Sequence, residues 1–505
     1  SWFMLPSLFP MSLSRACLKI SVAACALVAS AAGAKAEALP RPNVLLVMVD
    51  DLRTNLGCFG DPLAVTPNID RLAERSTRFD RAYCQISVCN PSRASMMTGR
   101  TPDDLRVWDL QTTFRARNPD TITLPQLFKA HGYHATAIGK IYHDPAKFRD
   151  PLSWSEPAEL DDTGEVRGKY ATEENLRIYQ PGGKRGREKA GATEAGEVPD
   201  EAYIDGRVAS RAQERLRELA AGAEPFFLAV GFRRPHLPFS APQKYWDLYD
   251  PANLTLEPAA AERPRDAPAL AFHDFPELRG YTDMPKAGPL ASAQVTRLRH
   301  GYYAATSYVD AQIGRVLETL AELGLEQKTV VVLVSDHGYH LGEQGLWTKT
   351  TNYEADVRVP LLMAVPGLTT GRETAALVES VDIYPTLAEL CDLSIPAEVT
   401  GISLIPNLTD AAAPGRSGAV SQFPRPWSGS ERDFDSMGYS VRTAENRYVE
   451  WRRFGTGEVT ARELYAYADD DVYEHANLAA DPKQAALLAQ MARLLPAAAP
   501  LRVGP

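Results

Sequence analysis

Short apolar runs, each followed directly by polar residues, recur along the chain. They occupy residues 44–49, 135–138, 226–230 and 329–334. Runs this short that stay apolar at successive positions suit strands buried on both faces of a parallel sheet. The carboxyl ends of parallel strands lie at one edge of a sheet, where ligands bind. We therefore expect the polar residues that follow the four runs to meet in a single cleft.

Helical patterns separate these runs. Thr66 followed by Pro67 is typical of a helix start. Between residues 309 and 320 apolar side chains recur at helical spacing, and Gly324 suits the end of that helix. Strands that alternate with helices predict an α/β fold, with a large, mostly parallel sheet sandwiched between helices.

The beginning of the chain has the pattern of an export signal. Residues 1–36 contain an N-terminal extension, a basic stretch with Arg15 and Lys19, an apolar run and an Ala-x-Ala motif that ends at Ala36. This order is typical of a secretory signal peptide, so we expect a periplasmic or extracellular protein. Cys25 lies in a sequence that also resembles a lipoprotein box, and a lipid anchor there stays open. We expect no transmembrane segment in the mature chain.

The remaining chain divides into two parts. Residues 37–412 contain all four apolar runs and form the predicted main domain, which would carry the active site. Residues 408–418 are rich in alanine, proline, glycine and serine, which is typical of a linker. We expect residues 413–505 to form a smaller C-terminal α+β subdomain, with a hairpin over residues 439–451.

Composition and charge exclude some classes of function. Among the 505 residues 45% are hydrophobic and 23% are charged, as in an ordinary globular protein. The net charge of −10 argues against a nucleic-acid partner. Beyond the signal the cysteines are Cys58, Cys84, Cys89 and Cys391. They are too few for a disulfide framework, so a free thiol is available for chemistry.

The most informative motif begins at Cys89. Residues 89–93 read Cys-Asn-Pro-Ser-Arg, and Gly99 of a Thr-Gly pair follows. This motif resembles the signature of the type I sulfatases, in which the cysteine is oxidised to formylglycine by a maturation enzyme. Pro91 suits the first turn of a helix, whose free N–H groups would face a bound anion. A lone cysteine before a helix is usually structural, whereas the full signature favours the precursor of a nucleophile.

Two pairs of polar residues suit a metal ion. Asp50 and Asp51 follow the first apolar run, and Asp336 and His337 follow the last. Adjacent carboxylates are costly unless a cation neutralises them, and their oxygens suit Ca²⁺ or Mg²⁺. The resemblance implies one Ca²⁺ bound by these four residues and by the modified Cys89, with Mg²⁺ as an alternative. His337 stands where many sulfatases have asparagine.

Basic residues complete the predicted site. They are Arg93, Lys140, His143, His236 and Lys349. The resemblance assigns Arg93 and Lys140 to stabilising the hydrated aldehyde. It assigns His143 to deprotonating the sulfated intermediate as that intermediate collapses. His236 would protonate the leaving oxygen of the substrate, and Lys349 would hold its sulfate group.

The resemblance covers residues 43–478 and, within the family, is strongest to the iduronate-2-sulfatases. Matches at residues 421–426 and 437–440 matter most, because sulfatases differ strongly in this region. Residues 158–200 and 252–295 depart from the pattern, and such loops often shape a substrate pocket. The resemblance implies an alkaline-phosphatase/sulfatase-like fold and a sulfuric ester hydrolase. It implies a sulfated sugar as substrate, with a 2-O-sulfated uronate of an acidic polysaccharide as our expectation.

Several alternatives stay open. Arg233 and Arg234 are candidates to bind the uronate carboxylate, because guanidinium pairs bidentately with carboxylate, but one of them could instead brace its loop. The substrate could also be another sulfated glycan. A phosphodiesterase or phosphatase of the same superfamily would usually carry serine or threonine in place of Cys89 and often two metal ions. A chain that is never matured would only bind sulfated glycans.

Overall fold

The computed structural model describes residues 41–144, 146–161, 168–179, 189–467 and 473–497. The predicted extension and signal peptide at residues 1–36, including Cys25, therefore lie outside the described residues. Within the described part of the chain, no helix is both long enough and apolar enough to cross a membrane.

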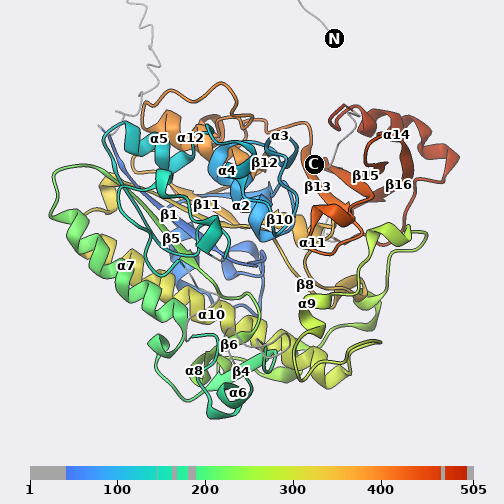
Figure 1. Ribbon diagram of the computed structural model, residues 1–505, viewed down its shortest axis with the longest axis horizontal. Helices are drawn as coiled ribbons and strands as arrows, with labels where there is room; N and C mark the ends of the chain where they lie inside the picture. The colour runs from blue at the N-terminus through green and yellow to red at the C-terminus, as the bar shows by residue number, and fades with distance from the viewer. Residues whose placement is uncertain (1–40, 145, 162–167, 180–188, 468–472, 498–505) are drawn as a thin grey trace, which may run out of the picture. The chain divides into compact units, whose positions relative to one another are not determined.

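An eight-stranded sheet forms the centre of the larger part of the chain (Figure 1). Its strands are β1 (Asn43–Val49), β2 (Thr77–Tyr83), β3 (His134–Gly139), β5 (Phe226–Phe232), β7 (Thr329–Ser335), β10 (Arg358–Val359), β11 (Leu361–Ala364) and β12 (Arg372–Glu379). The four predicted runs form neighbouring parallel strands in the order β7-β1-β5-β3. Only β10 and β11 run against the other strands of this sheet. The mostly parallel sheet that the sequence predicts is thus confirmed.

Helices cover both faces of this sheet (Figure 1). On one face lie α2 (Cys89–Thr98), α5 (Leu124–Ala130) and α12 (Ile383–Leu390). On the other lie α1 (Pro67–Ala73), α7 (Ile204–Ala220) and α10 (Ser292–Glu322). The predicted helix start at Thr66 and the apolar stripe over residues 309–320 correspond to α1 and α10. The layered α/β architecture is therefore as predicted.

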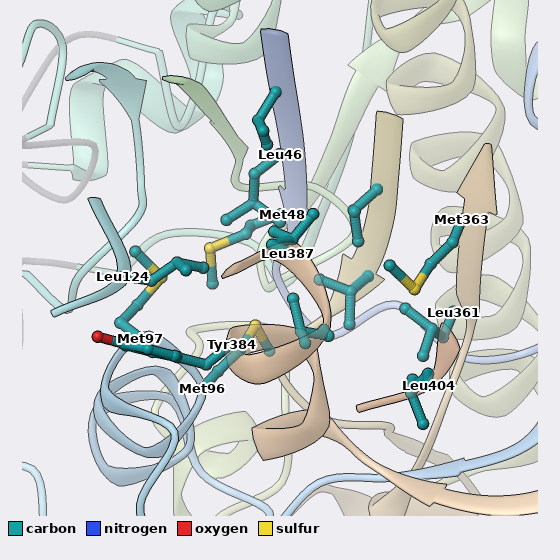
Figure 2. Packing of buried hydrophobic residues seen from close by; sticks show 14 of the residues in the cluster. Leu46, Met48, Met96, Met97, Leu124, Leu361, Met363, Tyr384, Leu387 and Leu404 are labelled. Carbon is teal, nitrogen blue, oxygen red and sulfur yellow. The ribbon is translucent and has the colours of Figure 1, made fainter. Parts of the chain in front are cut away.

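Side chains alternate along β1 and contribute to both layers. Leu46 and Met48 pack in the cluster that contains Met96 of α2 and Leu387 of α12 (Figure 2). The intervening Val47 belongs to the opposite cluster, with residues of α7 and α10. All three strand residues are fully buried, and such burial contributes about 1.5–3 kcal/mol per side chain. Apolar residues are thus required on both faces of β1, which explains its unbroken hydrophobic run.

The C-terminal part of the chain forms a separate antiparallel sheet (Figure 1). Its strands, in spatial order, are β13 (Ala419–Arg425), β14 (Ser436–Arg442), β15 (Asn446–Arg453) and β16 (Val459–Ala466). Helix α14 (Ala485–Ala492) packs against it. The predicted hairpin over residues 439–451 lies within β14 and β15 and is confirmed.

Short elements connect these layers. The strands are β4 (Thr193–Gly196), β6 (Phe239–Pro242), β8 (His340–Leu341) and β9 (Trp347–Thr348). The helices are α3 (Pro102–Leu105), α4 (Phe114–Arg117), α6 (Glu173–Ile178), α8 (Gln243–Trp246), α9 (Pro276–Arg279), α11 (Glu354–Val357) and α13 (Ile405–Thr409). Helix α9 carries one residue of the site described below, and another follows β9 directly.

A buried network of charges joins the antiparallel sheet to α11. Glu354 accepts hydrogen bonds from Arg442 Nε at 3.1 Å and from Arg447 Nη2 at 2.5 Å. Tyr83 of β2 donates to its other oxygen at 3.0 Å. Arg447 also donates to Glu474 at 3.1 Å. Buried charges require partners, so this network holds the C-terminal sheet against α11.

Replacing Glu354 with glutamine is expected to destabilise the protein by about 3 kcal/mol, because Arg442 and Arg447 lose a buried anionic partner. Burial acts to raise the pKa of Glu354, but the two arginines outweigh it and lower that pKa to about 2. A lowered native pKa stabilises the fold above the unfolded-state pKa, and this contribution is lost as the pH falls through 2. Urea unfolding measures the difference in stability between wild type and variant.

That difference should be constant near neutral pH and should shrink as the pH falls from about 4.5 to about 2. The exposed Glu389→Gln is the matched control and should change neither the stability nor its pH dependence. A Glu354→Gln protein as stable as this control would contradict the role of the network.

Candidate active site

The carboxyl ends of the parallel strands bring the predicted polar residues together. Asp50 and Asp51 follow β1, Lys140 follows β3, and Asp336 and His337 follow β7. All five side chains are almost completely buried. These polar residues therefore meet at one edge of the sheet, as their positions after the strands predicted.

Cys89 is the first residue of α2 and points into this group. Its Sγ lies 3.3 Å from His337 Nε2 and 3.5 Å from Asp50 Oδ1. Burial, reinforced by the Asp50 carboxylate, raises the pKa of the thiol well above its usual value. A neutral thiol is a poor nucleophile, so the position suits a cysteine that is chemically modified before it takes part in a reaction.

Arg93, one helical turn further along α2, ties three strand ends together. Its Nε donates to Asp336 Oδ2 at 2.8 Å, and its Nη2 donates to Asp50 Oδ1 at 3.1 Å. Its Nη1 donates to the backbone oxygens of Lys140 at 2.6 Å and Ile141 at 3.1 Å. The guanidinium is fully buried, so it acts as a fixed positive charge within the site.

Lys140 supplies a second fixed positive charge. Its Nζ lies 2.6 Å from Asp50 Oδ2. The strand ends approach closely here because Gly231 has no side chain: a Cβ at this position would lie 2.0 Å from the Lys140 oxygen. Burial acts to raise the pKa of Asp50, but Lys140 and Arg93 outweigh it and hold that pKa well below its usual range. Asp50 is therefore a carboxylate although it is buried.

Four side chains present ligand atoms to one point. Suitable atoms of Asp50, Asp51, Cys89 and His337 all lie within 4.8 Å of one another. Asp336 borders the group, with its Oδ2 3.6 Å from His337 Nε2, while its Oδ1 accepts the backbone N–H groups of Asp51 and His337 at 3.1 and 3.0 Å. Carboxylate oxygens, and an oxygen in place of Sγ after oxidation, fit a hard divalent cation.

The orientation of His337 supports this interpretation. Its Nδ1 lies 2.9 Å from the backbone oxygen of Gly338. A carbonyl can only accept, so Nδ1 carries a proton, and in the neutral form of the ring Nε2 presents its lone pair toward Cys89 and Asp51, at 3.3 and 3.4 Å. A backbone carbonyl that fixes the imidazole tautomer in this way is the usual support of a metal-binding histidine.

Lys349, the residue after β9, contacts the site through Asp51. Its Nζ lies 3.1 and 3.0 Å from the two carboxylate oxygens of Asp51. The flanking Thr348 and Thr350 have φ angles of 71° and 88°, a conformation that costs about 1–3 kcal/mol for a residue with a side chain. Arg425 of the C-terminal sheet donates to the backbone oxygen of Thr350 at 2.8 Å. Tertiary contacts thus hold Lys349 in a position that its local sequence disfavours.

His236 lies beside Lys349 and reaches the same carboxylate. Its Nε2 is 4.0 Å from Asp51 Oδ2 and 3.1 Å from Glu277 Oε1. The other oxygen of Glu277 lies 3.0 Å from Lys349 Nζ. Burial and the Lys349 ammonium lower the pKa of His236. The two basic residues that the sequence assigned to the substrate are therefore adjacent, with a carboxylate between them.

His143 lies at the margin of the site. Its ring packs edge-on against Phe148, with the ring centroids 5.0 Å apart. Among the described residues its Nδ1 has no hydrogen-bond partner. Burial and the Lys140 ammonium hold the pKa of His143 well below its usual value. The imidazole is therefore neutral at neutral pH and is able to accept a proton.

The two arginines after β5 differ in their surroundings. Arg233 is 7% exposed and pairs with Asp144 at 2.6 Å. Arg234 is fully buried, and its guanidinium donates to backbone oxygens, including those of Ser240 at 3.0 Å and His236 at 3.3 Å. Of the two alternatives that the sequence left open for these arginines, the contacts of Arg234 fit a residue that braces the loop carrying His236, and Arg233 remains the candidate for substrate binding.

Three residues that contact the site were assigned no role from the sequence. Glu277 lies in α9, within the region 252–295 whose departure from the family pattern was the only indication. Tyr302 of α10 donates to the backbone oxygen of Asp51 at 2.7 Å. Ser335 accepts from the backbone N–H of Leu52 at 2.9 Å. These contacts depend on tertiary packing, and no motif or spacing in the sequence marks them.

Two family models match the chain. The model described as sulfatase matches residues 42–393, and the model described as N-sulphoglucosamine sulphohydrolase, C-terminal, matches residues 342–499. The chain is 33% identical to iduronate 2-sulfatase of Homo sapiens, over 86% of this chain and 90% of that protein. It is 31% identical to choline-sulfatase of Rhizobium meliloti, over 72% of this chain and 71% of that protein.

Solved structures share the fold. A phosphonate monoester hydrolase from Silicibacter pomeroyi superposes with a TM-score of 0.70 and 24% identity, covering 90% of this chain and 94% of that one. A protein in complex with its substrate D-glucosamine-2-N,6-O-disulfate superposes with a TM-score of 0.69 and 22% identity, covering 90% and 96%. At such identities the likeness concerns the fold alone, and it confirms the predicted fold class.

A divalent cation is expected to stabilise the protein through the four-residue ligand group. Adding Ca²⁺ or Mg²⁺ at a hundredfold excess over its dissociation constant should contribute about 2.7 kcal/mol to the free energy of unfolding. Asp51→Asn should remove most of this gain, because the cation loses an anionic ligand, whereas the exposed Asp247→Asn should retain it. Thermal unfolding with and without the cation, together with elemental analysis, provides the measurement. Two transition-metal ions per chain would contradict the expected single site and favour phosphatase-like chemistry.

Proposed function

The chain belongs to the sulfatase family of enzymes, and from this premise we propose that it removes sulfate from a sulfated sugar. The substrate that we propose is a 2-O-sulfated uronate of an acidic polysaccharide. The observation that carries the proposal is the convergence of Cys89, the metal-ligand group and the His236–Lys349 pair at one sheet edge. The 33% identity to iduronate 2-sulfatase supports the choice of sugar.

The nucleophile in this proposal is made from Cys89 by a formylglycine-generating enzyme. The hydrated formylglycine supplies a hydroxyl group for attack on sulfur and a route by which sulfate later leaves. Arg93 and Lys140 hold the surrounding carboxylates in place and compensate their charge. His143 is neutral at the margin of the site, and it accepts the proton that must leave residue 89 when sulfate is released.

A single Ca²⁺, with Mg²⁺ as the alternative, is the proposed cofactor. Its ligands would be Asp50, Asp51, Asp336, His337 and residue 89. When bound there, such an ion would supply positive charge that stabilises developing negative charge in the site. The protein contributes by holding Asp50 ionised and by fixing the tautomer of His337. Both features are in place before a substrate arrives, so they cost no reorganisation during the reaction.

His236 and Lys349 act on the substrate side. His236 Nδ1 donates to the backbone oxygen of Leu237 at 2.6 Å, so the imidazolium form carries its second proton on Nε2, and this is the proton that passes to the leaving oxygen. Lys349 holds a sulfuryl oxygen with its ammonium group. Arg233, held by Asp144 at the edge of the site, pairs with the uronate carboxylate. Arg234 positions the loop rather than the substrate.

We further propose that the protein is exported to the periplasm or the extracellular space by the signal at residues 1–36. Anchoring through Cys25 is the alternative. Residues 37–412 form the catalytic domain and residues 413–505 the C-terminal subdomain in this proposal. The separate antiparallel sheet, whose first strand β13 begins at Ala419, supports that division.

Cys89→Ala is expected to abolish turnover of every sulfate ester, because the precursor of the nucleophile is gone. The fold should persist, since residue 89 lies at the site rather than in a hydrophobic cluster, and circular dichroism and thermal unfolding test this point. Mass spectrometry of the wild-type peptide around Cys89 should give a mass below that of the thiol form. Retained turnover in Cys89→Ala would exclude the proposed mechanism.

Substrate preference provides a second test. A 2-O-sulfated uronate should be hydrolysed with a higher kcat/KM than a sulfated neutral sugar or an aryl sulfate. Arg233→Ala should lower kcat/KM for the uronate roughly 10- to 150-fold, which corresponds to the loss of about 1.5–3 kcal/mol from a charged hydrogen bond, and should leave kcat/KM for the neutral sugar nearly unchanged. The exposed Arg265→Ala is the matched control.

Equal losses on both sugars would contradict a contact between Arg233 and the carboxylate. A preference for phosphate esters over sulfate esters would instead favour the phosphatase or phosphodiesterase alternative. A higher kcat/KM on the neutral sugar would point to another sulfated glycan.

A further inference from the structure

Glu277 of α9 occupies the position between the two basic side chains of the substrate side. Its Oε1 lies 3.1 Å from His236 Nε2, and its Oε2 lies 3.0 Å from Lys349 Nζ. Its side chain is 28% exposed, so it borders the open part of the site, whereas Lys349 is 5% exposed. No step of the proposed mechanism uses this carboxylate, and its position therefore requires an explanation.

The segment that carries Glu277 is firmly held. Phe275 and Leu278 are buried in a hydrophobic cluster with residues of α10 and β9. Arg279 donates to Asp274 Oδ1 at 2.7 Å and to the backbone oxygen of Pro285 at 2.9 Å. Phe275 has a φ of 31°, a conformation that residues with side chains keep only where their surroundings impose it. Packing and hydrogen bonds of the neighbouring residues therefore hold the Glu277 carboxylate at the site.

Both contacts of Glu277 use groups that a sulfate ester needs. The ammonium of Lys349 has three donors, and its neighbours are two oxygens of Asp51 and one of Glu277. The Nδ1 of His236 is engaged by the Leu237 oxygen, so only Nε2, which faces Glu277, is able to reach a leaving oxygen. A substrate that binds both residues must therefore replace the oxygens of Glu277.

The charge of Glu277 makes this replacement selective. Burial acts to raise the pKa of its carboxyl, but Lys349 and His236 outweigh it and hold that pKa well below its usual range. The carboxylate remains tethered by α9 after displacement and repels an anion in the same place. The repulsion is greater for inorganic sulfate and phosphate, which are mainly dianions at neutral to mildly basic pH, than for a sulfate monoester, which carries one charge.

We propose that Glu277 is a specificity-determining residue, which fills the sulfate subsite of the free enzyme and disfavours dianions there. This inference rests on the proposed function, because that function assigns His236 and Lys349 to the sulfate ester. Glu277 then limits inhibition by the product, inorganic sulfate, and discriminates against phosphate groups. It does so without taking part in bond breaking.

The test compares the inhibition constant for inorganic sulfate with the KM for a sulfate ester, using the mature, metal-loaded enzyme. Glu277→Gln should lower the inhibition constants for inorganic sulfate and phosphate about tenfold relative to the KM of the ester, because one repulsive unit charge is removed. Glu277→Asp retains the charge and should keep the wild-type ratio within about threefold. Glu262→Gln, an exposed carboxylate in the same region, should match the wild type.

An unchanged ratio in Glu277→Gln, or weaker binding of both inorganic sulfate and the ester, would overturn the inference. A purely structural role for Glu277 would lower the thermal stability and affect ester and inorganic sulfate alike. Wild-type turnover is measured first: its absence on every sulfate ester would overturn the proposed function and this inference with it. Turnover with an unchanged ratio would overturn the role of Glu277 alone.

Discussion

Three carboxylates buried at the carboxyl ends of β1 and β7 impose the constraint on which the site depends. Asp50, Asp51 and Asp336 have no solvent exposure, and each unpaired buried charge would cost several kcal/mol. The compensating cations come from separate elements: Arg93 from α2, Lys140 from the end of β3 and Lys349 from the residue after β9. The charges are balanced only when all these elements are in place, so formation of the site is coupled to formation of the fold.

The C-terminal sheet contributes to the same balance although we assign none of its residues to the reaction. Arg425 bonds to the backbone beside Lys349, and Asn352 donates to the backbone oxygen of Gly438 at 3.1 Å. The buried partners of Glu354 fix the next turn of the same segment. The strained backbone around Lys349 is thus maintained by a sheet that begins some distance later in the sequence, at Ala419. This explains why the small sheet is an integral part of the enzyme.

The sequence predicted those parts of the structure that local pattern determines. The apolar run at residues 44–49 and the hairpin at residues 439–451 are visible in one short window each, and strand ends locate Asp50 and Asp336 without further knowledge. The sequence did not predict Glu277, because its position follows from tertiary packing of neighbouring residues in a four-residue helix. It also left the roles of Arg233 and Arg234 open. The two arginines are adjacent in the sequence, and only their burial and hydrogen-bond partners in the fold distinguish them.

Charge also underlies the selectivity for the ester over inorganic sulfate that we propose for this site. While His236 is neutral, the three cationic side chains that compensate the buried carboxylates face four anionic ones when Glu277 is included, which leaves one negative charge. The proposed divalent cation converts this to one positive charge. A sulfate monoester then makes the site neutral, whereas inorganic sulfate makes it negative again. In a buried site of low effective dielectric constant such a difference favours binding of the ester and release of the product.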